Sequence, residues 1–317
     1  MAHFDRDLSN NSSADEIDLL KIIQVLWQEK LIIITITFIG AVFSVILALS
    51  IPNTYKSNAL LAPINQGESL SSKFSSVSAI SSLAGISIPT EVGSKSQEAI
   101  ARIRSLDFFT NQFLPYINLE DLMALQKWNP RDNTLVYDTD KFDPILKKWV
   151  RKPNYPYKII PSNQEAYEVY QQILSISEDR KTKFITISTH SYSPYIAKDW
   201  LDVIVNNINE SMRLEDIELA SSHIKFLNEQ YLETNLTPIK ESISKILETK
   251  IQKLMLASAD KNYIFNILEK PVVPDFKYSP SRAIICILIT FISGLFSLLI
   301  VIARHFYFIK RNDWKSN

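Results

Sequence analysis

The chain has 317 residues, with 34 basic and 34 acidic side chains, and 46% of its residues are apolar. This length suggests about two domains, and the balanced charge gives no indication of a nucleic-acid partner. The single cysteine, Cys286, excludes any disulfide within the chain. Only five glycines are present, which favours long helices over the glycine-rich turns of an all-β protein.

The first thirty residues predict a polar tail that ends in an amphipathic helix. Ser13 and Glu16 have the spacing of a capping box, and apolar side chains then recur at helical spacing up to Trp27. Two interpretations remain open for this helix. It is either a plain juxtamembrane helix or a docking surface for a partner.

Residues 31–50 form a run of twenty residues without a charge. As a helix this run is roughly 30 Å long, the thickness of a bilayer core, and it lacks the polar face of a buried core helix. Ala48 and Ser50 resemble the small residues of a signal-peptide cleavage site. Because the run is long and six acidic residues precede it, we interpret it as an uncleaved transmembrane anchor.

The chain from 51 to 115 predicts mixed elements. Alternating residues predict a strand over 55–63, and a serine-rich stretch over 67–96 predicts a long loop with a short helix. Residues 96–114 are helical in pattern. Residues 115–161 are rich in Trp, Tyr, Asp and Pro, and their sequence pattern does not predict the order of helices and strands. They are candidates for a helix-tip region or for a contact between protomers.

Residues 173–274 have clearer patterns. Two alternating runs, 173–177 and 184–189, predict a β-hairpin, and the Ser193-Pro194 pair suits the start of a helix. From Leu214 the helical pattern continues for more than forty residues, or roughly 60 Å, with a kink or a break expected at Pro238. Residues 262–274 alternate like a strand. The first and last strands are expected to pair in an α/β base from which the long helix projects.

The second uncharged run covers residues 283–303 and predicts a second transmembrane helix. Before it stand Pro271, Pro274, Pro280 and Arg282, a candidate membrane-entry and length-control motif. Proline fixes φ and prevents a helix, so these residues predict a rigid, extended approach to the membrane; a simple helix stop is the alternative. Ser293, Gly294 and Ser297 form a small-residue face where another helix can approach closely, unless the glycine is merely tolerated there.

The two short tails contain three Lys or Arg in residues 1–30 and four in residues 304–317. The positive-inside rule then places both termini in the cytoplasm. The expected organisation is therefore a cytoplasmic tail (1–30), a first span (31–50), a periplasmic domain (51–282), a second span (283–303) and a second cytoplasmic tail (304–317).

Motifs for catalysis or cofactor binding are missing from the sequence. It has no phosphate-binding glycine loop and no nucleophile elbow, and its four histidines are scattered. Asp138, Asp140 and Asp143 lie close enough in sequence for acid–base work on a sugar, but a charged loop is the favoured interpretation. We expect no enzyme activity, no cofactor and no metal.

Several segments together resemble the polysaccharide co-polymerases, the Wzz-type chain-length determinants of bacterial O-antigen and related glycans. The resemblance rests on the order of five segments and on the two-anchor topology. These segments are EIDLLKIIQVLWQEK (16–30), PNTYKSNALLAP (52–63), SSLAGISI (81–88), FITISTHSYSPYIAKDWLDVIVNNIN (184–209) and LMLASADKNYIFNILEKPVVPDFKYSPSR (254–282). Residues 115–161 have no counterpart in it.

The resemblance implies an α+β membrane protein of the bacterial inner membrane, with two transmembrane helices around a periplasmic domain that has an α/β base and a long helical projection. It implies a ring-like homo-oligomer that regulates the modal length of a surface glycan without enzyme activity. The expected partners are membrane lipids, a Wzy-type polymerase and undecaprenyl-linked glycan. The alternatives are a structural adaptor for polysaccharide export, a membrane-anchored periplasmic sensor and an enzyme acting on the lipid-linked glycan.

Overall fold

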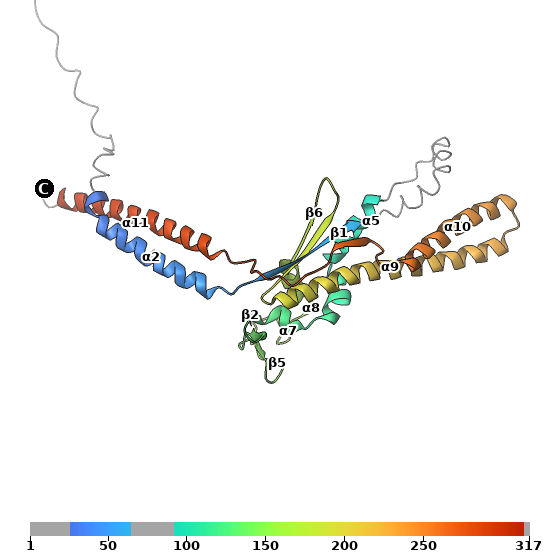
Figure 1. The fold of residues 1–317 in the computed structure, drawn as a ribbon, viewed down its shortest axis with the longest axis horizontal. Helices are drawn as coiled ribbons and strands as arrows, with labels where there is room; N and C mark the ends of the chain where they lie inside the picture. The colour runs from blue at the N-terminus through green and yellow to red at the C-terminus, as the bar shows by residue number, and fades with distance from the viewer. Residues whose placement is uncertain (1–25, 65–91, 314–317) are drawn as a thin grey trace, which may run out of the picture. The chain divides into compact units, whose positions relative to one another are not determined.

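The structure, a computed structural model, describes residues 26–64 and 92–313. The chain divides into two compact units. One, the helix-pair unit, comprises Met1–Ile51 and Pro280–Asn317, and the other, the α/β unit, comprises Pro52–Ser279. Residues 67–91 of the serine-rich stretch and most of the predicted N-terminal helix lie outside the described residues, whereas residues 92–96 of that stretch begin a helix. Figure 1 shows the elements of each unit.

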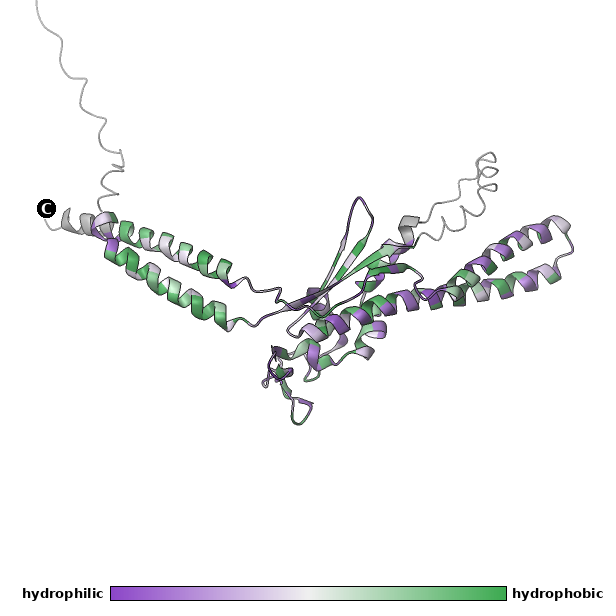
Figure 2. Cartoon of the chain, viewed as in Figure 1, coloured by the Kyte–Doolittle hydropathy of each residue, from purple (hydrophilic) through white to green (hydrophobic). Residues whose placement is uncertain are grey.

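The helix-pair unit contains two long apolar helices, α2 (Lys30–Ser50) and α11 (Arg282–Asp313). Each contains a stretch long and apolar enough to cross a membrane, Lys30–Ser50 and Arg282–Arg304. Only 11% of each stretch is buried, whereas a helix in the core of a soluble protein would be mostly buried. Figure 2 shows hydrophobic residues along the length of both helices. The helix that contains the second predicted span continues beyond it to Asp313.

The α/β unit is built on a four-stranded antiparallel sheet of order β6-β7-β1-β8. Along β1, the side chains of Ser57, Ala59 and Leu61 are buried, as alternation in a strand with one face in the core requires. The predicted hairpin and the predicted pairing of the first and last strands are both confirmed. The strands are β1 (Tyr55–Pro63), β6 (Leu174–Glu178), β7 (Ile185–Ser191) and β8 (Phe265–Glu269).

Short helices complete the core beside the sheet. Ser105 and Ser162 begin two of them, because each hydroxyl accepts a hydrogen bond from a backbone N–H three residues later, at 3.1 and 3.3 Å. The core that they close is aromatic, with the Phe113 ring 4.8 Å from Tyr170 and 6.3 Å from Trp200. The elements are α5 (Val92–Ile103), α6 (Leu106–Phe108), a π-helix (Phe109–Phe113), a 3-10 helix (Leu114–Tyr116) and α8 (Asn163–Ile173).

The longest element is α9 (Pro194–Glu233), a helix of 40 residues and thus about 60 Å. Its first half packs on β1 and β7 through buried side chains at helical spacing, including Leu201, Ile204 and Ile208. The chain then turns at residues 234–236 and returns along α9 as α10 (Thr237–Ala259), with Pro238 in its first turn (Figure 1). The predicted break is confirmed, but it reverses the chain. The projection is therefore a helical hairpin instead of one kinked helix.

The segment that the sequence left unordered, residues 115–161, contains one short helix and two small hairpins. The Trp128 ring lies 5.4 Å from Tyr55 at the start of β1 and 6.1 Å from Tyr195 at the start of α9. The helix-tip interpretation is therefore wrong, because these contacts place the segment at the opposite end of α9. The elements are α7 (Leu119–Met123), β2 (Leu125–Asn129), β3 (Thr134–Tyr137), β4 (Phe142–Asp143) and β5 (Lys148–Trp149).

Candidate functional site

The proline-rich segment after β8 runs extended beside the start of β1. The Ser57 hydroxyl donates a hydrogen bond to the Val272 carbonyl at 2.8 Å. Further along, the Thr54 N–H donates to the Ser279 carbonyl and the Tyr278 N–H donates to the Thr54 carbonyl, both at 2.8 Å. Residues 270–281 contain no helix, as the prolines among them, Pro271, Pro274 and Pro280, predict.

Arg282, the last residue of the candidate entry motif, opens α11. Its Nε donates a hydrogen bond to the Ala48 carbonyl at 3.1 Å. The last four carbonyls of an α-helix have no partner within the helix, so the guanidinium supplies a donor to the end of α2. The two apolar helices are thus joined by a charged group at one end. Sequence reasoning found Arg282 but not this contact.

The two apolar helices approach each other closely at a glycine that sequence reasoning did not single out. A Cβ added to Gly40 would lie 2.3 Å from Ser293 Oγ and 2.4 Å from its Cβ. A Cβ added to Gly294 would meet only Thr37, at 3.9 Å, an ordinary van der Waals contact. Ser297, which donates to the Gly294 carbonyl at 2.7 Å, is fully buried. The small-residue face therefore does lie toward α2, but Gly40 and Ser293 make the tight contact.

Gly294 instead lines an open apolar groove of about 650 Å³ on the helix pair. The groove contains side chains of both helices, among them Thr37, Cys286 and Leu298. Its lining is almost wholly apolar. Such a surface suits lipid or a further apolar helix.

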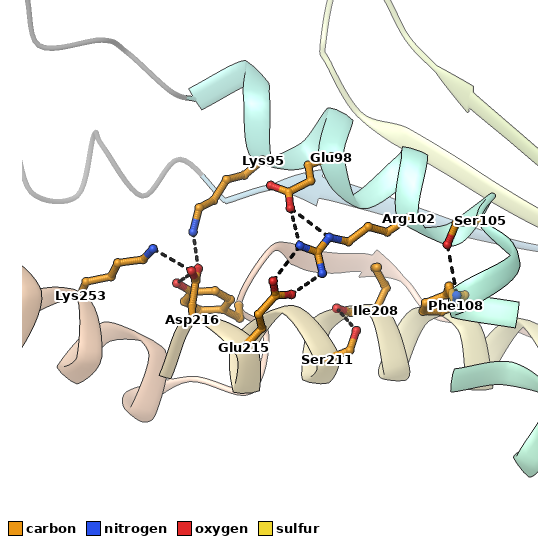
Figure 3. A network of polar contacts seen from close by, with 11 residues as sticks. Lys95, Glu98, Arg102, Ser105, Phe108, Ile208, Ser211, Glu215, Asp216 and Lys253 are labelled. Atoms are coloured by element: carbon orange, nitrogen blue, oxygen red, sulfur yellow. Dashed lines mark hydrogen bonds and ion pairs between the residues drawn. The ribbon is translucent and has the colours of Figure 1, made fainter. Parts of the chain in front are cut away.

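A network of charged side chains joins three helices of the α/β unit around Asp216 on α9 (Figure 3). Its carboxylate accepts hydrogen bonds from Lys253 of α10 at 2.7 Å, from the Tyr263 hydroxyl at 2.6 Å, and from Lys95 of α5. Burial alone would raise the pKa of Asp216, but these three donors outweigh it and lower the pKa to about 2. Asp216 therefore remains charged at neutral pH and holds α5, α10 and the approach to β8 against α9.

A second ion-pair cluster lies beside it. Arg102 of α5 donates to Glu98 at 2.9 Å and makes a bidentate contact with Glu215 of α9. The hydrogen bond from Arg102 lowers the pKa of Glu215. Because both side chains are more than a third exposed, solvent screens this pair, and we expect it to contribute less than the Asp216 cluster.

The last strand is fixed to α9 by one buried amide, that of Asn209. Its Oδ1 accepts from the N–H groups of Ile264 and Phe265 at 3.0 and 2.9 Å, and its Nδ2 donates to the Phe265 carbonyl at 3.3 Å. These bonds satisfy buried backbone groups at the edge strand β8. Together with the Tyr263–Asp216 bond, Asn209 therefore holds the start of β8 against α9, ahead of the proline-rich residues 270–281, here called the entry segment.

The three aspartates considered for acid–base work serve local turns. Asp138 accepts from the Asp140 N–H at 3.1 Å and pairs with Lys141 at 3.5 Å. Asp143 accepts from the N–H groups of Ile145 and Leu146 at 2.9 and 3.0 Å. These contacts are those of Asx turns, as the charged-loop interpretation expected. Within residues 26–64 and 92–313, no group of three or more His, Cys, Asp or Glu side chains could hold a metal ion.

Comparison with known proteins finds one family match. The model of the Wzz family, "Chain length determinant protein", matches residues 15–109, which contain the first apolar helix and the first strand. No curated protein matches the sequence. Over these residues the match agrees with the resemblance to Wzz-type co-polymerases that the sequence predicted.

Two solved structures are similar to this chain. One is a "full-length bacterial polysaccharide co-polymerase", 14% identical, with a TM-score of 0.39 and coverage of 94% of this chain and 99% of that one. The other is a "Fragment of WzzB, Polysaccharide Co-polymerase from Salmonella Typhimurium", 14% identical, with a TM-score of 0.30 and coverage of 72% and 100%.

Proposed function

We propose that this protein regulates the chain length of a bacterial surface polysaccharide without being an enzyme itself. The observation that carries the proposal is the match of residues 15–109 to the chain-length-determinant family. The two apolar helices around a single α/β unit are consistent with it, because a length regulator must stay beside a membrane-bound polymerisation reaction.

The proposal includes an orientation and two partners. Both helices cross the bacterial inner membrane with their tails in the cytoplasm, so that the α/β unit is periplasmic. There it acts with a Wzy-type polymerase on undecaprenyl-linked repeat units of O-antigen or a related glycan. The apolar groove beside Gly294 supports a contact with a further transmembrane helix, either from the polymerase or from a second copy.

Self-association into a ring is supported by the outer half of the helical hairpin. Beyond the part that packs on the sheet, α9 and α10 expose large apolar side chains, including Phe226 (59% exposed), Leu232 (80%) and Met255 (65%). Monomeric proteins rarely leave so much apolar surface along one projection uncovered. A neighbouring copy of the hairpin would bury it.

The entry segment is proposed to transmit the state of the α/β unit to the membrane. Its backbone is bonded at Val272 to Ser57 of β1 and at Tyr278 and Ser279 to Thr54, just before β1. Arg282 is bonded to the end of α2. Replacing Pro274 and Pro280 by Ala would relax φ between these fixed points. We expect a shifted or broader glycan length distribution at unchanged protein level.

The control for the proline variant is Pro238→Ala, because Pro238 lies in the first turn of α10, where alanine is accepted. The readout is the polysaccharide ladder on a gel. An unchanged ladder for the double variant, with wild-type protein amounts, would refute the role of the entry segment and leave the prolines as a helix stop.

The ladder from cells without the gene tests the proposed function itself. Collapse of a modal cluster to a smooth decay of lengths supports length regulation. An unchanged ladder favours the adaptor for export of another glycan, and complete loss of polymer favours an enzyme. A sensor would instead change gene expression.

A further inference from the structure

Residues 144–161 form an exposed, positively charged segment, here called the basic lobe. It contains Lys147, Lys148, Arg151, Lys152 and Lys158 and no acidic residue, in a chain whose formal net charge is zero. The four lysines are exposed. Among the described residues none of these four has an ion-pair partner, so their charge faces solvent.

The basic lobe also exposes large apolar side chains to an unusual degree. Tyr155 is 98% exposed, Ile145 90% and Leu146 64%, and Tyr157, Ile159 and Ile160 are each more than half exposed. Aliphatic side chains, tyrosines and lysines on one short segment are the composition of a membrane-interface surface. A sugar-binding platform would instead set flat aromatic faces beside carboxylates, which this segment lacks.

The basic lobe is held in place, so the exposure is built into the fold. Arg151 makes a bidentate contact with Glu165 of α8 and also donates to the carbonyls of Lys158 (2.5 Å) and Ile159 (2.8 Å). The pairing with Arg151 lowers the pKa of Glu165, so the contact persists at neutral pH. At the other end the Phe142 ring packs against Trp149 at 5.3 Å. The apolar side chains between these anchors are therefore presented outward.

The basic lobe is connected through aromatic contacts to the start of β1. The Phe142 ring, which packs against Trp149 of the lobe, also packs on Tyr137 of β3 at 5.6 Å, and Trp128 of the paired strand β2 packs on Tyr55, the first residue of β1. Only residues 51–54 separate Tyr55 from Ser50, where α2 ends, and five fully extended steps of chain span at most about 17 Å. The covalent chain therefore limits the distance between Tyr55 and the end of the first predicted span to this length.

We propose that the basic lobe binds the surface of the membrane through anionic phospholipid headgroups, with Tyr155 and Ile145 entering the interface. This lobe lies outside the segment that matches the length-determinant family, and the proposal does not depend on that function. Each lysine near an anionic surface changes the partition by about fivefold, so four of them make the contact selective for lipid charge.

The test uses the full chain in lipid nanodiscs. Cys286→Ala removes the single cysteine, and a fluorescent probe is then attached at Tyr155→Cys. Lipids that bear nitroxide groups quench this probe when it lies at the membrane. Discs of phosphatidylcholine are compared with discs that also contain phosphatidylglycerol. We expect quenching at least about twofold stronger in the anionic discs, and weaker quenching at high salt because salt screens the lysines.

Two controls distinguish the basic lobe from the rest of the surface. A probe at Asn235→Cys, in the α9–α10 turn, should show no dependence on lipid charge. Gln at Lys147, Lys148, Lys152 and Lys158 should abolish the difference between the discs, whereas Gln at Lys225, Lys240, Lys245 and Lys250 on the hairpin should leave it. Equal quenching in both lipids, no quenching in either, or probe protection only by added oligosaccharide would each overturn the proposal.

Discussion

The Asp216 cluster is the structural feature whose energetic role can be tested most directly, by the substitution Asp216→Asn. The variant keeps the size of the side chain but removes the negative charge that accepts hydrogen bonds from Lys95, Lys253 and Tyr263. The ordinary pKa of 3.8 is lowered to about 2 in the folded protein. A tenfold change in proton affinity corresponds to about 1.4 kcal/mol, so the charged form stabilises the fold by about 2 kcal/mol at neutral pH.

The pH dependence of this stabilisation has a definite sign. Because the pKa of Asp216 is lower in the folded than in the unfolded chain, the contribution is complete above about pH 4. It is lost as the pH falls from 4 toward 2, where the carboxylate becomes protonated in both states. The stabilities of the wild type and Asp216→Asn should therefore differ at pH 7 and converge near pH 2.

Thermal unfolding of the full chain in detergent, followed by tryptophan fluorescence, measures the effect. The α/β unit spans residues 52–279, and for a unit of this size a loss of about 2 kcal/mol corresponds to a melting temperature about 4–8 °C lower. The matched control is Glu215→Gln, which removes the exposed partner of Arg102 and should cost no more than about 1 kcal/mol. Equal melting of Asp216→Asn and the wild type at pH 7, or an equal loss in the control, would refute the reasoning.

Two further substitutions test the packing of the helix pair and of the last strand. Gly40→Ala should destabilise the helix pair by about 1–3 kcal/mol in thermal unfolding, because the added methyl group overlaps Ser293. The control Gly294→Ala should be tolerated. Ser293→Gly should restore the stability that Gly40→Ala loses. If Ser293→Gly does not restore stability, the overlap with Ser293 is not the cause of the loss. Asn209→Leu should cost about 2–5 kcal/mol and speed hydrogen exchange of the amides of β8, because two buried N–H groups lose their acceptor. Asn209→Asp retains an acceptor oxygen and should keep more protection; equal exchange in both variants would contradict the anchoring role.

Most of the elements followed from local sequence patterns. The uncharged runs define the two apolar helices because each is long enough to cross a bilayer, and alternation defines the hairpin of β6 and β7 because one face of the sheet is buried. The Ser193-Pro194 pair marks the start of α9 because proline suits the first turn of a helix. The resemblance to Wzz-type co-polymerases includes segments within residues 15–109, which the family model also matches.

Other features depended on contacts between residues distant in the chain. Asp216 lies 121 residues from Lys95 and 37 from Lys253, and no local pattern indicates that the three meet. Likewise the sequence drew attention to Gly294, whereas the close approach occurs at Gly40. Helical periodicity shows which face of a helix is apolar, but the register between two helices fixes which residue of that face touches the partner.

The sequence by itself determined the two membrane-length helices, the β6–β7 hairpin and the start of α9, since each is encoded within a short stretch of adjacent residues. Only the tertiary structure decided that the chain reverses at residues 234–236, that residues 115–161 pack at the start of β1, and that a basic lobe stands exposed there. The physical reason is that the hydrophobic pattern of a sequence indicates which side chains are buried. Which residues they pack against depends on the packing of the whole chain.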